Sequence, residues 1–229
     1  VCRSTFGGYG GPVYSAPDEP APAAPPTDDL SSVPLKRTPT QSRSREKVSK
    51  ALAAADRIAV REGVDALTLT RVAEEAGLSV GALHQYLPDR DAIAAALVAR
   101  YHERIENLMD DVIDRIEVEE IADPVAEVIG HIAGIYTDER SVQIVRSIAR
   151  LPGGPSRAHK ARMAVKVCEL MQACGLTGCD MTVARTVFAA ADAVMHEAFS
   201  AVGEDGATTP DTALLAELED MIRAYLDQR

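Results

Sequence analysis

Apolar side chains recur at three- and four-residue spacing from about residue 44 onward, which is the pattern of helices with one buried face. No stretch alternates apolar and polar residues as a half-buried strand does, and no Asn-Gly hairpin turn occurs. The predicted fold class is therefore all-α, with about nine helices. The first helix is expected over residues 44–62, closed by Gly63, and its apolar face consists of Val48, Leu52, Ala55, Ile58 and Ala59.

Two short helices are predicted to meet at Gly77, where a helix ends and the backbone needs a left-handed residue. The apolar stripe before this glycine consists of Val72, Ala73 and Ala76. After it, Ser79 is a good N-cap for a second helix, and Pro88 ends the segment. This is the spacing of a helix-turn-helix, whose second helix lies in the DNA major groove. The same corner also occurs in ordinary all-α proteins, so spacing alone leaves both alternatives open.

A basic segment without any apolar residue leads into the first helix. Its cationic side chains are Lys36, Arg37, Arg43, Arg45 and Lys47. Taken alone, such a segment is consistent with a solvated linker. Next to a helix-turn-helix, it favours an arm that binds DNA.

Residues from about 36 to 100 resemble the N-terminal domain of the tetracycline-repressor-like (TetR) family. The resemblance is carried by residues 64–93, which combine the Gly77 turn, Gly81 and the sequence Tyr86-Leu-Pro at fixed spacing. It implies a three-helix DNA-binding domain, followed by a helical domain for ligand binding and dimerisation. The expected division is a disordered tail at 1–35, the arm and helix-turn-helix at 36–88, and the regulatory domain at 89–229.

The recognition helix departs from the family pattern. The family commonly has Lys, Thr, Tyr and Phe where this chain has Val80, Ala82, His84 and Leu87, so few donors for base edges remain. Gln85 can bond an adenine edge, and Val or Ala methyl groups can contact a thymine methyl. The residues expected to contact DNA are Lys36, Arg37, Arg43, Arg45, Thr68, Ser79, Val80, Gly81, Ala82, His84, Gln85, Tyr86 and Arg90.

The net charge of −11 argues against DNA binding only until the chain is divided. Residues 36–104 carry 12 Lys or Arg and 9 Asp or Glu, which gives +3. Residues 105–229 carry 11 against 22, and residues 1–35 carry 1 against 4. The positive charge therefore lies with the helix-turn-helix, and the acidic remainder would orient the protein on DNA by repelling phosphates. A soluble acidic bundle without such a role is the alternative.

Residues 1–35 are rich in Gly, Pro and Ala and are expected to be disordered. The chain has no apolar run that suits a signal peptide or a membrane span, so we expect a cytoplasmic protein without membrane contacts. The spacings of Cys2, Cys168, Cys174 and Cys179 match no zinc signature. Reduced thiols are expected, with no metal and no cofactor. The alternative is a redox or soft-metal sensor formed by Cys174 and Cys179.

Downstream of Pro88, six helices are predicted. The first is a long connecting helix capped by Asp89, which runs to about residue 116. A helix with Asp123 as its N-cap and Pro124 at its first position follows. The remaining helices are expected at 138–148, 156–174, 180–202 and 209–227.

The last two helices have wide apolar faces that a small domain is not expected to cover by itself. The resemblance implies that such a pair forms a four-helix bundle with the same pair of a second subunit. The alternative is burial within one chain. The residues assigned to this dimer interface are Val183, Val187, Val194, Leu214, Leu218, Ile222 and Leu226.

A ligand pocket is expected between the connecting helix and the last helix pair. Its candidate lining consists of Tyr136, Arg146, Met163, Met171, Phe188, Asp192, Met195, His196 and Phe199. Few of these side chains are polar, which favours a largely apolar small molecule held by one or two hydrogen bonds. A set of Met and aromatic residues is also typical of an ordinary core.

These features predict a homodimeric transcriptional regulator, a repressor that a small molecule releases from a palindromic operator in duplex DNA. The alternative is a helix-turn-helix DNA-binding module without an effector. An enzyme is not expected, because the chain has no glycine loop for phosphate, no nucleophile–base pair and no metal-ligand spacing.

Overall fold

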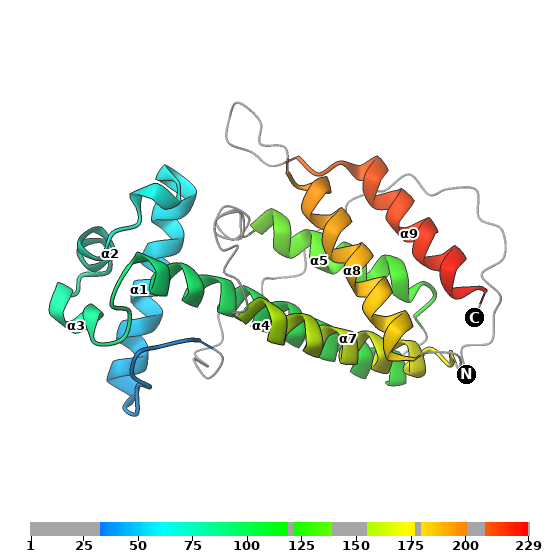
Figure 1. Cartoon of the computed structure of the whole chain (residues 1–229), viewed down its shortest axis with the longest axis horizontal. Helices are drawn as coiled ribbons and strands as arrows, with labels where there is room; N and C mark the ends of the chain where they lie inside the picture. The colour runs from blue at the N-terminus through cyan, green and yellow to red at the C-terminus, as the bar shows by residue number, and fades with distance from the viewer. Residues whose placement is uncertain (1–32, 119–120, 139–154, 177–179, 201–208, 229) are drawn as a thin grey trace. The chain divides into compact units, whose positions relative to one another are not determined.

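The computed structural model describes residues 33–118, 121–138, 155–176, 180–200 and 209–228 (Figure 1). Within these ranges the chain is all-α, as predicted, with eight α-helices, one 3-10 turn and no strand. The residues fall into two compact units, and the division lies inside the long helix α4 (Arg90–Val118), after Arg104. None of the helices described has the length and apolar character needed to cross a membrane.

The N-terminal unit is built from α1 (Ser42–Glu62), the 3-10 turn η1 (Val64–Ala66), α2 (Leu69–Ala76), α3 (Val80–His84) and the first part of α4. Helix α1 packs on η1, α2 and α3. The residues that it buries there include all those of the apolar face predicted from the sequence. The largest fully buried side chains of the unit are Leu52, Ile58, Leu67, Leu83, Leu87 and Ile93.

Short polar side chains set where these helices begin. The hydroxyl of Thr68 accepts a hydrogen bond from the Arg71 amide, and the hydroxyl of Ser79 accepts one from the Ala82 amide. Asp89 caps α4 in the same way, at 2.8 Å from the amide nitrogen of Ala92. Each cap satisfies a backbone donor that the first turn of a helix leaves without a partner.

Gly77 ends α2 in the left-handed conformation that the sequence predicted, with φ 66° and ψ 35°. Its amide donates to the Glu74 carbonyl, and the next amide, of Leu78, donates to the Ala73 carbonyl at 2.8 Å. This pair of bonds is a Schellman motif, which closes the carbonyl end of a helix. The sharp turn into α3 is therefore fixed by backbone bonds.

Residues 33–35 correct the predicted boundary of the disordered tail. Val33 is buried, and Leu35 packs against the core of the N-terminal unit. The Lys36 amide donates to the Tyr86 carbonyl at 3.0 Å, and this bond holds the segment beside the end of the helix-turn-helix. The prediction of disorder rested on the overall composition of residues 1–35, which does not show that Val33 and Leu35 at the end of this segment pack against the core.

The second unit contains the rest of α4, α5 (Pro124–Asp138), α7 (Pro155–Ala173), α8 (Met181–Ala198) and α9 (Thr212–Leu226). Glu106 pairs with Arg162, and Asp110, four residues on, pairs with Lys166, so α4 and α7 run side by side in the same direction (Figure 1). Helix α9 packs on both α8 and α5.

Two predicted helix limits were wrong. Helix α8 ends at Ala198 instead of residue 202, because its C-cap, Phe199, leaves the helical conformation with φ −110° and ψ 16°. Helix α9 begins at Thr212, since the Asp211 carboxylate caps it through the Leu214 amide, three residues after the predicted start. The helix expected at 138–148 lies outside the described residues apart from Asp138, which belongs to α5.

Candidate nucleic-acid interface

Helix α3 presents a row of exposed positions beside a single buried one. Leu83 is buried in the core, whereas Ser79, Gly81, His84 and Gln85 are exposed. Val80 is 41% exposed, although it is a β-branched apolar residue at the first position of the helix. Ala82 is half-buried. The exposed face of α3 therefore combines one apolar side chain with the amide of Gln85 and the imidazole of His84.

Two residues predicted to contact DNA also have a structural role. The Thr68 and Ser79 oxygens accept backbone hydrogen bonds as helix caps, and each hydroxyl still has a proton to donate. Tyr86 was also expected to contact DNA, yet its ring belongs to the core and the residue is only 9% exposed. Any contact of Tyr86 with DNA is thus limited to the small exposed part of the residue.

Three arginines near the junction of α1 and α2 are neutralised by two glutamates. Arg57 and Arg61 both reach Glu75, at 3.1 and 3.3 Å. Arg61 and Arg71 both reach Glu62, at 2.9 and 2.5 Å. Hydrogen bonds from Arg57 to Glu75 and from Arg71 to Glu62 lower the pKa of each carboxyl below its ordinary value. The network joins α1 to α2, and it leaves these cations little net charge for DNA.

Other cations of this unit fall into two groups. Arg90, predicted to bind a phosphate, pairs with Asp65 at 2.9 Å. In contrast, no carboxylate within the described ranges forms an ion pair with the basic side chains of the arm and the first turns of α1, all of them exposed: Lys36, Arg37, Arg43, Arg45 and Lys47. The available positive charge therefore lies where the sequence placed the DNA-binding arm.

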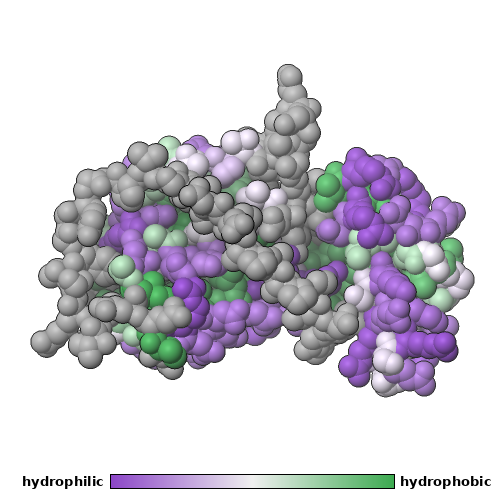
Figure 2. All heavy atoms as spheres, turned by 180° about the vertical axis from the view of Figure 1, so that it is seen from behind, coloured by the Kyte–Doolittle hydropathy of each residue, from purple (hydrophilic) through white to green (hydrophobic). Residues whose placement is uncertain are grey.

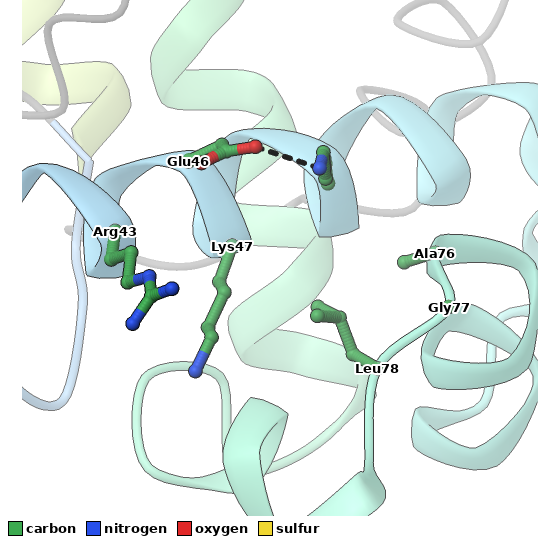
Figure 3. A pocket seen from close by; sticks show the side chains of 7 residues that line it. Arg43, Glu46, Lys47, Ala76, Gly77 and Leu78 are labelled. Atoms are coloured by element: carbon green, nitrogen blue, oxygen red, sulfur yellow. Dashed lines mark ion pairs between the residues drawn. The ribbon is translucent and has the colours of Figure 1, made fainter.

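A groove of about 380 Å³ lies between α1 and the turn from α2 to α3. We call it the α1 groove, and its lining consists of Arg43, Glu46, Lys47, Lys50, Ala76, Gly77 and Leu78. Figure 3 shows Arg43 and Lys47 extending from the same side of α1, whereas Glu46 is directed along the helix toward its ion-pair partner. Sequence analysis placed Arg43 and Lys47 in the basic arm but missed Lys50, because a periodic pattern does not show which turn of a helix faces another segment.

The second unit brings part of the predicted ligand pocket together. Tyr136 of α5 lies 3.4 Å from the Nδ1 atom of His196, and its ring packs on Phe199 with centroids 5.1 Å apart. Asp192 forms an ion pair with Lys160 at 3.4 Å and lies one helical turn before His196. Met163, Met171 and Met195 are buried, Phe188 is half-buried, and Arg146 lies outside the described residues.

A buried histidine site in this unit was not predicted. His159 of α7 is 3% exposed, and its Nδ1 atom donates to Glu106 of α4 at 2.8 Å. Burial acts to raise the pKa of Glu106, but the hydrogen bonds from His159 and Arg162 outweigh it and lower that pKa to about 2. No sequence signal joins positions 53 residues apart, so only the packing of α4 on α7 reveals this site.

The argument for the dimer interface was wrong in one respect. The apolar faces of α8 and α9 do find partners within the chain, because Val183, Leu218, Ile222 and Leu226 are all buried in the single subunit. Val187, Val194 and Leu214 are half-buried. Some of the side chains that α8 and α9 expose are small or apolar, and the others are polar or charged. The first group is Met181, Ala189, Ala193, Ala213, Ala216, Met221 and Ala224, and the second is Thr182, Arg185, Thr186, Glu197, Thr212, Glu217 and Asp220.

Cys168 and Cys174 are both half-buried. Cys2 and Cys179 lie outside the described residues, so the proposed pairing of Cys174 with Cys179 does too. Among the described residues, no group of three or more His, Cys, Asp or Glu is arranged to hold a metal ion.

Residues 51–97 match the sequence model of the bacterial regulatory proteins of the tetR family. No curated protein matches the chain. Among solved structures, a putative TetR-family transcriptional regulator from Mesorhizobium loti is 18% identical with a TM-score of 0.63, over 81% of this chain and 97% of that one. Multidrug binding protein EbrR, complexed with ethidium, is 21% identical with a TM-score of 0.55, over 77% and 98%.

A third similar structure is that of SmeT, the repressor of the Stenotrophomonas maltophilia multidrug efflux pump SmeDEF. It is 20% identical with a TM-score of 0.55, over 77% of this chain and 88% of that one. The matched residues 51–97 include α2, α3 and the Gly77 turn on which the resemblance was based. Residues 51–97 therefore have the sequence pattern of the bacterial regulatory proteins of the tetR family, and the chain has the fold of TetR-family transcriptional regulators.

Proposed function

We propose that this protein is a homodimeric DNA-binding repressor that a small molecule releases from its operator. The observation that carries the proposal is the exposed face of α3, in a unit whose unpaired cations gather on the arm and the first turns of α1. SmeT, with the same fold, is described as a repressor, which supports repression rather than activation as the role proposed here.

On DNA, α3 would enter the major groove and place Ser79, His84 and Gln85 at base edges. Backbone phosphates would be held by the arm cations together with Thr68 and Arg90. A second copy of the chain would supply the other half-site of a palindromic operator, since dimers of helix-turn-helix proteins bind two half-sites one helical turn apart. The exposed faces of α8 and α9 are the surface that we assign to this dimer.

An effector would bind the second unit. Its buried Met and aromatic side chains suit an apolar molecule, and Tyr136, Asp192 and His196 offer the few polar atoms that would orient it. EbrR, of the same fold, is described as a multidrug binding protein and holds ethidium, which supports a small-molecule effector. Because α4 belongs to both units, an effector that favours one arrangement of α4 would change the spacing of the two recognition helices.

DNA binding by the whole chain is expected to weaken steeply with salt. Each phosphate contact adds about 0.9 to the negative slope of log affinity against log salt concentration on duplex DNA. Titration of random duplexes and of sites selected from a random library, at several salt concentrations, measures this slope. A flat salt dependence on every duplex would rule out DNA binding, and selected sites no tighter than random ones would rule out a specific operator.

Val80 is expected to contact a thymine methyl group, because it is the exposed apolar residue on α3. Replacing the contacted thymine by uracil in the selected operator removes that methyl and should weaken binding about fourfold, which is the effect of one buried methyl group. In Val80→Ala the same base change should have little effect. Val60→Ala is the matched control, since Val60 is 46% exposed on α1. An equal uracil effect in wild type and Val80→Ala would contradict this role.

A further inference from the structure

We propose that the α1 groove is a phosphate-binding site, and that its occupant is the sugar–phosphate backbone of DNA next to the bases that α3 contacts. The proposal rests on the proposed function. It places Arg43 and Lys47 of the arm at one phosphate site, and it adds Lys50 and Glu46 to the residues that govern DNA affinity.

The charge of the groove is the first argument. Three cations and one carboxylate line it, so its net charge is positive. Lys50 and Glu46 neutralise each other at 2.7 Å, and this contact lowers the pKa of Glu46, which stays ionised. Arg43 and Lys47 remain, and no described carboxylate forms an ion pair with either of them. A phosphodiester, with one negative charge per nucleotide, matches this pair of cations.

The second argument is a contrast within the same helix. The cations in the second half of α1, Arg57 and Arg61, are held by Glu75. In the first half, Arg43, Lys47 and Lys50 line an open groove (Figure 3). Two exposed cations on successive turns repel each other weakly. An anion between them removes this repulsion and gains two charge-assisted hydrogen bonds.

The walls of the groove suit a nucleotide backbone better than a small free anion. The amides of Gly77 and Leu78 already donate within the Schellman turn, so the side chains must hold the phosphate. Ala76 and Leu78 give the groove an apolar wall, against which a deoxyribose can pack. The volume of about 380 Å³ leaves room for a sugar beside the phosphate.

The groove also lies at the right place along the chain. Leu78, in its wall, is two residues before Val80, the first residue of α3. Two residues span at most about 7 Å, so a DNA strand whose bases meet α3 passes close to the groove.

The test uses the whole chain and duplex DNA of random and of selected sequence. Lys47→Gln should lower affinity on both alike, by about eightfold at 0.1 M salt, and should reduce the salt slope by about 0.9, which is the effect of one lost phosphate contact. Arg57→Gln is the matched control on α1, and it should leave the slope unchanged. An unchanged slope in Lys47→Gln, with wild-type DNA binding intact, overturns the groove assignment alone.

Glu46→Gln gives a result of opposite sign, which damage to the fold cannot imitate. It removes the only carboxylate lining the groove and releases Lys50, so affinity for both duplexes should rise and the slope should become steeper by about 0.9. A fall in affinity, or no change, contradicts the proposal.

A titration with inorganic phosphate distinguishes a site for the DNA backbone from a site for a free anion. In the DNA assignment, millimolar phosphate shifts the NMR amide signals of Leu78 and Lys47 weakly, and duplex DNA shifts the same signals strongly. Strong shifts with phosphate and none with DNA would show a site for a free anion and overturn the proposal. An absence of DNA binding by the wild type at every salt concentration would instead remove the proposed function itself.

Discussion

Leu218→Ala is expected to lower the free energy of unfolding of the second unit by about 2–5 kcal/mol, the usual range for a leucine truncated in a packed core. Leu218 is 2% exposed, and its helix packs on both α8 and α5. Urea denaturation followed by circular dichroism measures the change. Val165→Ala, on α7 at 45% exposure and outside the proposed dimer surface, is the control and should change stability by less than about 1 kcal/mol. Equal losses for the two variants would contradict the burial of Leu218 within one subunit.

The same logic separates folding from dimerisation. Ala193→Arg places a charge on the exposed face of α8, and it should leave the fold intact while producing monomers in sedimentation experiments. A charged residue at Leu218 should instead unfold the unit, because an unpaired charge in a core is far costlier than a lost surface contact. If Ala193→Arg stays dimeric, the dimer uses a different surface from the one that we assign to it.

Acid is expected to remove a part of the stability that depends on Glu106. The pKa of Glu106 falls from 4.5 to about 2 on folding, and its side chain is 14% exposed. A lowered pKa in the folded state means that the contribution is complete above about pH 4.5 and is lost as the pH falls toward 2. Arg162 is 49% exposed, so solvent screening reduces the full effect, and we expect about 1–3 kcal/mol.

Comparison with Glu106→Gln isolates this contribution from the other carboxylates. The difference in unfolding free energy between wild type and Glu106→Gln should be largest near pH 7 and should shrink steadily below pH 4.5. Glu75→Gln is the control, because Glu75 pairs with arginines at the exposed surface. A difference between wild type and Glu106→Gln that stays constant from pH 7 to pH 3 would show that Glu106 acts only through packing.

The helix-turn-helix could be predicted closely from the sequence because its signals are local. The predicted caps at Ser79 and Asp89 and the glycine at 77 each act within a few residues of the backbone that they satisfy. The all-α class followed from the same short-range periodicity. A resemblance confined to residues 64–93 was enough to identify the family domain, since its spacing is fixed by these local contacts.

Contacts between distant segments could not be predicted. Periodicity showed that Leu218, Ile222 and Leu226 face one way, but it does not say whether the same chain or a second subunit covers them. The pairing of His159 with Glu106 depends on how α7 lies along α4, and the α1 groove depends on where the Gly77 turn meets α1. Such contacts are set by tertiary packing, which one sequence does not show.

The anchoring of Val33 and Leu35 determines how short a DNA-binding fragment of this chain can be. Both side chains pack against the core of the N-terminal unit, and the Lys36 amide is tied to Tyr86 at the end of the helix-turn-helix. A fragment that began at Lys36 would keep every predicted DNA contact but lose two apolar side chains from its core. A fragment that began just before Val33 would keep both side chains, and it would hold Lys36, the first residue of the arm, beside Tyr86.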